Sequence, residues 1–218
     1  MKTLKVGKDY NMEITSLTHE GLGVGRIDGI AVFVYNALVG EETVITITEV
    51  KKSFCFGKVK QIIKKSPDRV KPVCSLYGRC GGCNFMHLAY ESQLEAKLEI
   101  FKQILKRLGK LDCVKVEEVI PASKIYNYRN KVVIFFKEVK GDIIYGFYRR
   151  ETNQIERMEK CFLFNEKIYS ILKKIKEFML KDLEKNFITS VSFRNNDNDS
   201  KIAITSMAVI FDEVTNPP

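Results

Sequence analysis

Four of the chain's six cysteines have a spacing that could hold a metal centre. Cys74, Cys80 and Cys83 lie within the run "CSLYGRCGGC", and Cys161 follows in "RMEKCFLF". Four thiolates suit either tetrahedral zinc or a cubane iron–sulfur cluster, because both need soft anionic sulfur at four corners. Zinc ribbons commonly supply two close pairs of ligands, whereas three clustered ligands and one distant ligand suit a cluster. The spacing favours iron–sulfur and leaves zinc and ordinary reduced thiols as alternatives.

The residues around these cysteines support the same interpretation. Gly81 and Gly82 allow backbone amides to approach inorganic sulfides, which need hydrogen-bond donors. His87 could ligate a metal, but beside three cysteines we expect it to support the site rather than bind to it. Cys55 and Cys113 have no thiol neighbour in the sequence, so we expect both to be packing residues.

The composition is that of a globular protein that needs no disulfides. The chain has 218 residues, of which 45% are hydrophobic, enough for two small cores. It begins without a charged and then apolar leader, and its apolar runs are far shorter than the ~18 residues of a membrane span. We therefore expect a cytoplasmic monomer without membrane contact, in which thiols stay reduced. Clustered thiols in that setting more often bind metal than form disulfides.

Positive charge is concentrated in the first three fifths of the chain. Residues 1–131 carry 22 Lys and Arg against 14 Asp and Glu, whereas residues 132–218 carry 14 against 13. Such an uneven basic surface indicates binding to a polyanion, above all nucleic acid. The alternative is a basic surface that serves only solubility.

Residues 1–63 are predicted to form a small barrel of the oligonucleotide-binding type, built from five short antiparallel strands. The strands are expected in "YNMEITSL", "GVGRI", "GIAVFVY", "ETVITITEV" and "FCFGKVKQII". Asp28 and Gly29 are the signal of a two-residue hairpin in which both residues adopt positive φ. The run "GLGVG" at 21–25 lacks the full spacing of a dinucleotide-binding loop and opens no helix, so we reject that function.

Residues 64–73, which contain Pro67 and Pro72, are expected to be a linker, and residues 74–218 a second domain of the α+β class. The first two of its strands are expected in "YRNKVVIFFKEV" and "DIIYGFYRR", which flank a turn at Lys140 and Gly141. The last two are expected in "FITSVSFR" and "KIAITSMAVIF", which flank the polar turn "NNDNDS" at 195–200. Apolar residues on both faces of 132–136 predict an interior strand covered on both sides. The fold class is therefore an all-β OB-like barrel followed by an α+β domain that carries the cysteine centre.

Two amphipathic helices are predicted from apolar residues at helical spacing. The stripe of the first is Leu94, Leu98, Phe101, Ile104, Leu105 and Leu108, and Gly109 ends the helix. The second spans about 166–185, with the stripe Ile168, Ile171, Leu172, Ile175, Phe178, Met179 and Leu183.

Six motifs, taken in order, resemble the N-terminal half of the iron–sulfur RNA uracil-5-methyltransferases, the ribosomal RNA-modifying enzymes that begin with a TRAM barrel. The motifs are "VGRIDGIAVFVYNALVGE", "SPDRVKPVC", "CGGCNFMHLAYESQLEAK", "YNYRNKV", "GFYRRETNQI" and Cys161. In that family a 4Fe-4S cluster is held by three clustered cysteines and a later one. The resemblance thus assigns the cluster to Cys74, Cys80, Cys83 and Cys161.

The resemblance also implies a chemistry. A cysteine thiolate attacks C6 of a flipped uridine, S-adenosylmethionine methylates C5, and a base then removes the C5 proton. Family members place those groups in a C-terminal domain, and we find none of their motifs in these 218 residues, so we assign no catalytic residue. We expect the RNA-binding half of such an enzyme, inactive alone, with ribosomal RNA as its partner. The alternative is a stand-alone RNA-binding iron–sulfur adaptor or sensor without catalysis.

Some basic and aromatic residues are candidates for RNA contact. Basic residues neutralise phosphates, and exposed aromatic rings stack on unpaired bases. The basic residues that we expect to contact RNA are Arg129, Lys131, Lys58 and Lys60. Three aromatic residues of the barrel strands could stack on bases or form barrel core: Phe33, Tyr35 and Phe56.

Overall fold

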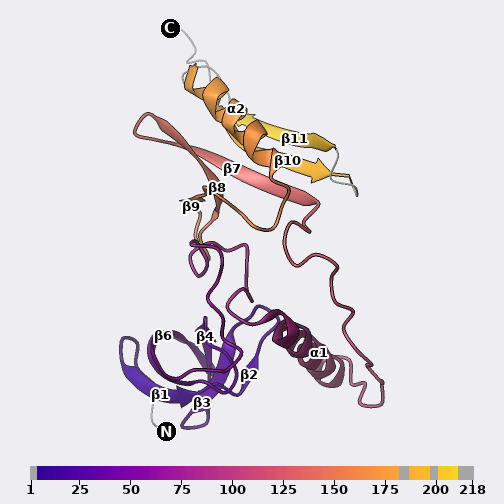
Figure 1. The fold of residues 1–218 in the computed structure, drawn as a ribbon. Helices are drawn as coiled ribbons and strands as arrows, with labels where there is room; N and C mark the ends of the chain where they lie inside the picture. The colour runs from indigo at the N-terminus through magenta and orange to yellow at the C-terminus, as the bar shows by residue number, and fades with distance from the viewer. Residues whose placement is uncertain (1–3, 182–186, 197–200, 211–218) are drawn as a thin grey trace. The chain divides into compact units, whose positions relative to one another are not determined.

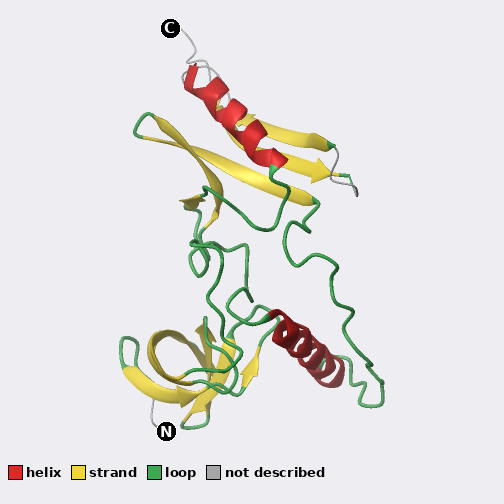
Figure 2. Cartoon of the chain, viewed as in Figure 1, coloured by secondary structure: helices red, strands yellow, loops and turns green. Residues whose placement is uncertain are grey.

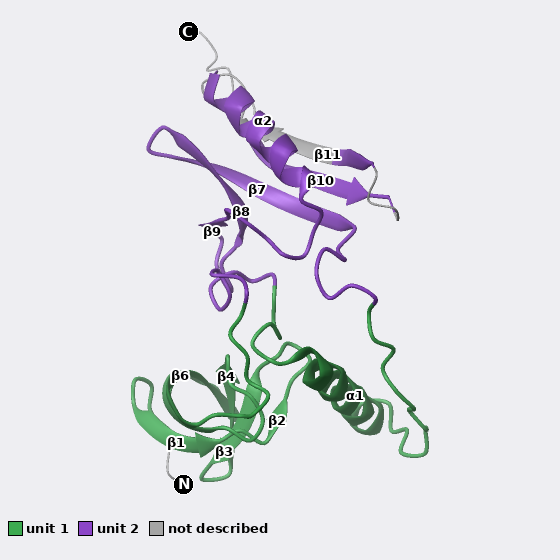
Figure 3. Cartoon of the chain, viewed as in Figure 1, with its two compact units in different colours: residues 1–72, 83–122 green, residues 73–82, 123–218 purple. Residues whose placement is uncertain are grey.

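The structure is a computed structural model that describes residues 4–181, 187–196 and 201–210 (Figures 1 and 2). It divides into two compact units, residues 1–72 with 83–122 and residues 73–82 with 123–218 (Figure 3). This division differs from the expected boundaries at 63 and 74, because the first helix and its flanking segments pack with the barrel. Within the described residues, no helix is long and apolar enough to cross a membrane.

The first unit contains a six-stranded sheet. Its strands are β1 (Asp9–Glu13), β2 (Ser16–Leu17), β3 (Gly23–Ile27), β4 (Ile30–Tyr35), β5 (Glu42–Val50) and β6 (Phe54–Lys64), in the order β1-β5-β6-β4-β3-β2. One stretch of chain, residues 9–17, supplies both outermost strands. The sheet therefore closes into a barrel, as predicted, and leaves little free edge. It has six strands instead of the five expected, because the segment expected as one strand is divided into β1 and β2.

The pairing inside the barrel differs from the prediction at one place. β4 and β6 pair in parallel, with Phe33 opposite Phe56, whereas the other neighbouring strands are antiparallel. β6 lies between β4 and β5 in the sheet, parallel to β4 and antiparallel to β5. The predicted hairpin turn is confirmed, since Asp28 and Gly29 have φ of 49° and 84°.

Helix α1 (Tyr90–Arg107) packs against the barrel by a different face from the one predicted. Ala96 and Ile100 contact a small core that is formed by Leu17, Leu38 and Leu88. Several residues of the predicted stripe are exposed instead, among them Phe101 at 49% and Leu108 at 79%. The apolar surface that the barrel offers determines which face of the helix packs, and this tertiary context overrides the most hydrophobic stripe.

The segment predicted as a linker is bonded to the barrel. The Arg69 side chain donates to both carboxylate oxygens of Glu41, at 2.5 and 2.8 Å, and to the Asn36 carbonyl oxygen at 2.7 Å. Glu41 is fully buried and also accepts hydrogen bonds from the amides of Leu38 and Ser66. Burial opposes its ionisation, but the hydrogen bonds from Arg69 and these amides hold the pKa of Glu41 below its usual value.

The second unit contains an antiparallel five-stranded sheet with one helix on it. Its strands are β7 (Lys131–Val139), β8 (Asp142–Tyr148), β9 (Ile155–Arg157), β10 (Phe187–Asn195) and β11 (Ile202–Ile210), in the order β11-β10-β7-β8-β9. Helix α2 (Lys167–Lys181) packs on one face. The α+β arrangement and the hairpin turn at Lys140 and Gly141, with φ of 54° and 80°, agree with the prediction.

The stripe of α2 is largely as predicted. Ile168, Leu172, Ile175 and Met179 are buried against the sheet. Phe178, also assigned to the stripe, is 60% exposed, because the contact stripe is narrower than the apolar one. The predicted stripe residue Leu183 and most of the predicted turn at 195–200 lie outside the described residues.

The central position of β7 is confirmed, but its two faces are not equally covered. Val132, Ile134 and Phe136 are buried under α2, whereas Val133 and Phe135, on the other face, are only half-buried. The prediction that both faces are covered is therefore wrong for this strand. Alternating side chains point to opposite faces, and the helix packs on one of them.

Candidate functional site

The first cysteines lie in a loop of the second unit that is joined to the end of β8. The Gly81 amide donates to the Tyr148 carbonyl oxygen at 3.0 Å, and the Arg150 amide donates to the Arg79 carbonyl oxygen at 3.0 Å. A Cβ added at Gly81 would lie 3.3 Å from the Tyr148 oxygen, so glycine permits this close approach. These bonds place Cys80 opposite Arg149.

Cys161 is held by helix α2. The Tyr169 hydroxyl donates to the Cys161 carbonyl oxygen at 2.8 Å and accepts a hydrogen bond from the Cys161 amide. Burial raises the pKa of Tyr169 to about 12, so its hydroxyl remains a donor. A hydrogen bond from the Leu163 backbone reaches the Cys161 thiol.

The fold of the second unit brings Cys161 into electrostatic reach of two of the clustered cysteines. Burial raises the pKa of the Cys161 thiol, and the nearby thiols of Cys74 and Cys80 raise it further. Burial likewise raises the pKa of Cys80, whose sulfur accepts a hydrogen bond from the Gly82 amide at 3.4 Å. Arg129 is close enough to favour the thiolate form at both positions. Cys83, the remaining predicted ligand, belongs to the first unit.

The four predicted cysteine ligands are of the right chemical type for a metal site, but their side chains are not arranged around a common point. Within the described part of the chain, no three His, Cys, Asp or Glu side chains are arranged to hold a metal ion. The four predicted ligands are nevertheless half-buried reduced thiols, and amide donors reach two of them. Thiolates that accept hydrogen bonds from backbone amides are suited to bind zinc or an iron–sulfur cluster. Without a bound metal, the negative charges of clustered thiolates would repel one another, so the thiols would stay protonated.

The other two cysteines and His87, for which the sequence predicted roles outside metal ligation, differ in their burial. Cys55 is 1% exposed in the barrel core, so it is confirmed as a packing residue. Cys113 is exposed, and the same prediction is wrong for it. His87 is buried in the first unit beside Arg69 and Glu41. Burial, followed by the positive charge of Arg69, lowers its pKa to about 4.

Aromatic rings gather on the outside of the barrel. Phe33, Phe54 and Phe56 contact one another, with ring centroids 5.5 to 5.8 Å apart. The alternate residues of the same strands, including Val32 and Val34, fill the core. The candidates from the sequence therefore lie outside the barrel core, and the sequence analysis missed Phe54, which the period of two in β6 could have revealed.

The predicted basic residues occupy two places. Lys58 and Lys60 lie on β6, on the same outer face as Phe56, and both are exposed. Lys60 forms an ion pair with Asp9. In the second unit Lys131 is exposed at the start of β7, and Arg129 is half-buried, with its amide donating to the Leu163 carbonyl oxygen at 2.8 Å. Each pair therefore lies within one unit.

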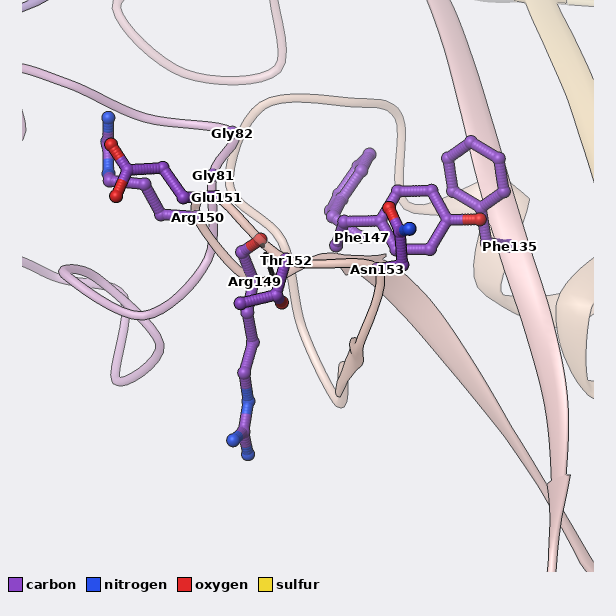
Figure 4. Close-up of a pocket in the computed structure, with 10 residues that line it drawn as sticks. Gly81, Gly82, Phe135, Phe147, Arg149, Arg150, Glu151, Thr152 and Asn153 are labelled. Carbon is purple, nitrogen blue, oxygen red and sulfur yellow. Dashed lines mark hydrogen bonds between the residues drawn. The ribbon is translucent and has the colours of Figure 1, made fainter.

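A cavity in the second unit was not predicted from the sequence. It has a volume of about 720 Å³ and lies between strands β7 and β8, the turn at 149–153 and the glycines of the cysteine loop (Figure 4). Phe135 and Tyr148 form its aromatic wall, with ring centroids 4.3 Å apart and planes at 34°. Arg149, beside the cavity, pairs at 2.5 Å with the buried carboxylate of Glu156.

The comparison with protein families decides the nature of the barrel. Residues 3–60 match the TRAM domain. The first unit therefore carries a TRAM domain. The match covers strands β1 to β5 and most of β6, and the outer aromatic and basic face described above belongs to this TRAM domain.

The longer part of the chain is homologous to RNA methyltransferases. It is 43% identical over 181 residues to an uncharacterized RNA methyltransferase of Clostridium acetobutylicum, covering 80% of this chain and 39% of that protein. It is 42% identical over 176 residues to another from Caldanaerobacter subterraneus subsp. tengcongensis, covering 79% and 39%. The chain thus spans about two fifths of the length of these relatives.

A solved structure shares the fold. The crystal structure of a Pyrococcus abyssi tRNA (uracil-54, C5)-methyltransferase in complex with S-adenosyl-L-homocysteine aligns with a TM-score of 0.61. The match covers 88% of this chain and 44% of the archaeal one, at 23% identity. At this identity the likeness establishes a common fold.

Proposed function

We propose that these residues are the RNA-binding and iron–sulfur part of an S-adenosylmethionine-dependent enzyme that methylates C5 of a uridine in ribosomal RNA in the cytoplasm. The observation that carries the proposal is the homology to RNA methyltransferases over 181 residues. The archaeal protein of similar fold is a tRNA (uracil-54, C5)-methyltransferase. The ribosomal substrate follows from the motifs given in the sequence analysis.

The TRAM domain supplies a surface suited to single-stranded RNA. Phe33, Phe54 and Phe56 offer ring faces, and Lys58 lies one step further along β6. Stacking on aromatic rings contributes ~1 to 3 kcal/mol per base, whatever the sequence of the RNA. A lysine beside such rings neutralises a phosphate of the same strand. In the second unit, Arg129 and Lys131 would contact phosphates near the start of β7.

The four cysteines at 74, 80, 83 and 161 would hold the 4Fe-4S cluster. When bound, the cluster supplies a cross-link between distant parts of the sequence, and methyl transfer by the uracil route needs no electrons from it. The residues of this chain prepare the ligands: Tyr169 fixes the backbone of Cys161, and the Gly82 amide donates to Cys80. We therefore propose a structural role for the cluster.

The metal proposal is tested by anaerobic purification with iron, sulfide and zinc analysis. We expect about four iron and about four sulfide atoms per chain, and a lower melting temperature for Cys80→Ser. The matched control is Cys113→Ser, which replaces an exposed thiol and should change neither value. Stoichiometric zinc without sulfide would assign the site to zinc and refute the cluster.

The enzymatic proposal is tested with the full product of the gene. Transfer of a labelled methyl group from S-adenosylmethionine to uridine C5 in a ribosomal RNA transcript is the expected result. Transfer to tRNA alone would correct the substrate. An open reading frame that stops at codon 218, together with RNA binding and no methyl transfer, would instead favour the stand-alone adaptor or sensor.

A further inference from the structure

The cavity beside β8 has the composition of a nucleotide site. Its aromatic wall is the Phe135 and Tyr148 pair, on the sheet face that α2 leaves uncovered. Tyr148 is 38% exposed, so one ring remains accessible while Phe135 supports it from the neighbouring strand. Unpaired bases stack on exposed aromatic rings of this kind, as they do on the sheets of RNA-recognition domains.

The turn that faces this wall is held in one conformation. The Arg149 amide donates to the Gln154 carbonyl oxygen at 2.7 Å, and the Thr152 hydroxyl accepts from the Gln154 amide at 3.1 Å. Glu151 has a φ of 57°, which the closed turn requires. Figure 4 shows that this turn places Asn153 on the side of Phe135 and Phe147. An amide side chain has an acceptor and donors in one plane, a pattern that complements N3–H and O4 of uracil.

Charge on the other side of the turn suits a phosphate. Arg149 and Arg79 both pair with the one buried carboxylate of Glu156, at 2.5 and 3.3 Å, so two guanidinium groups share one negative charge. The Arg149 side chain remains 47% exposed, and Figure 4 shows it extending away from the rings. The phosphate of a nucleotide stacked on Tyr148 would therefore lie near the guanidinium group of Arg149.

We propose that this cavity binds one unpaired nucleotide of RNA, with the base stacked on Tyr148, its edge at Asn153 and a phosphate near Arg149. The proposal rests on the RNA-binding function proposed above, and it adds a base-binding site to the TRAM surface and to the phosphate contacts proposed for Arg129 and Lys131. The Asn153 amide can accept from N3–H and donate to O4 of uracil, so an oligouridylate is a suitable probe.

The test is binding of a fluorescent, single-stranded oligouridylate of about 12 nucleotides, a length within the usual site sizes. We expect Tyr148→Ala to weaken binding about 5- to 150-fold and to leave the salt slope unchanged, because no phosphate contact is lost. Tyr148→Phe keeps the ring and should stay within about 2-fold of the wild type. Phe178→Ala removes an exposed ring from α2, on the opposite side of the sheet, and is the matched control.

A second measurement locates the RNA directly. Oligouridylate that contains 4-thiouridine is crosslinked with light, and we expect the adduct in the peptide that contains residues 148–153. Asn153→Ala, in an exposed turn, should weaken binding even where Tyr148→Ala lowers the melting temperature. If the wild type binds the RNA and both variants bind it with the same affinity, the nucleotide site is wrong but the proposed function stands. Adducts that form only outside residues 148–153 would have the same meaning. A wild type that binds no RNA overturns the proposed function as well.

Discussion

The two units show two ways to bury one side of a β-sheet. The TRAM domain closes its sheet on itself, so the inner face becomes core and nearly every strand edge is paired. The second unit keeps its sheet open and covers one face with helix α2. The closed sheet exposes the outer face that carries Phe33, Phe54 and Phe56, whereas the open sheet leaves the half-buried face that carries Phe135 and Tyr148. We therefore expect the stability of the barrel unit to depend on buried polar bonds, such as that between Glu41 and Arg69, and the stability of the second unit to depend on the packing of α2.

The buried ion pair of the barrel unit gives the largest expected effect. Glu41→Ala removes the partner of Arg69 and leaves the amides of Leu38 and Ser66 without their acceptor. We expect a loss of about 3 to 5 kcal/mol in the free energy of unfolding, measured by denaturant titration. Glu42→Ala, which removes an exposed ion pair with Lys64, should cost less than about 1 kcal/mol. Equal losses would show that the Glu41 network does not anchor residues 64–73.

The helix of the open sheet gives a comparable but smaller effect. Leu172→Ala truncates a fully buried side chain of α2 and should cost about 2 to 5 kcal/mol, depending on how far the cavity collapses. Leu180→Ala makes the same change on the same helix, at a residue that is 39% exposed. Unfolding followed by circular dichroism should separate the two variants. Similar stability of both would mean that α2 contributes little to the second core.

Acid should destabilise the first unit through His87. Its pKa is about 4 in the folded chain, against an ordinary value near 6.5. Between these values the unfolded chain binds a proton that the folded chain does not, so stability falls as the pH falls from about 6.5 to about 4. The loss should reach about 3 kcal/mol.

The chain has only one other histidine, His19, which makes the acid effect easy to assign. His87→Phe should remove most of the pH dependence in this window, and His19→Asn should retain it. Melting temperatures measured from pH 7 to pH 4 provide the readout. A flat profile in the wild type would contradict the burial of an uncharged imidazole beside Arg69.

The smallest expected effect compares two lysines of the barrel. Lys58→Ala should lower the slope of log affinity against log salt by about 0.7 for single-stranded RNA. Lys60 shares its charge with Asp9, so Lys60→Ala should lower the slope less. Binding of oligouridylate at several salt concentrations measures both. A larger change for Lys60 would show that the ion pair opens when RNA binds.

Much of the fold could be predicted from local patterns. Turn chemistry located the hairpins at Asp28 and Lys140, and apolar periodicity located α2 and its buried face. A period of two separates the faces of a strand but does not say which face is inside. For this reason Phe33 and Phe56 remained ambiguous until the barrel placed Val32 and Val34 in the core.

What could not be predicted depends on contacts between distant segments. The face by which α1 packs follows from the position of Leu38 on the barrel. The nucleotide cavity arises because the cysteine loop pairs with the end of β8, through the bond from Gly81 to Tyr148. The spacing of the cysteines indicated a common site, and the structure brings Cys161 within reach of Cys74 and Cys80.

Residues 9–17 supply both outermost strands of the barrel sheet, so this one segment protects both edges of the sheet. If a protease cut behind Leu17, β5 and β3 would both lose their outer neighbour at once. Two rows of backbone donors and acceptors would then face solvent and could template pairing with other chains. A nick at this point would thus promote self-association, although it would remove fewer than a tenth of the residues.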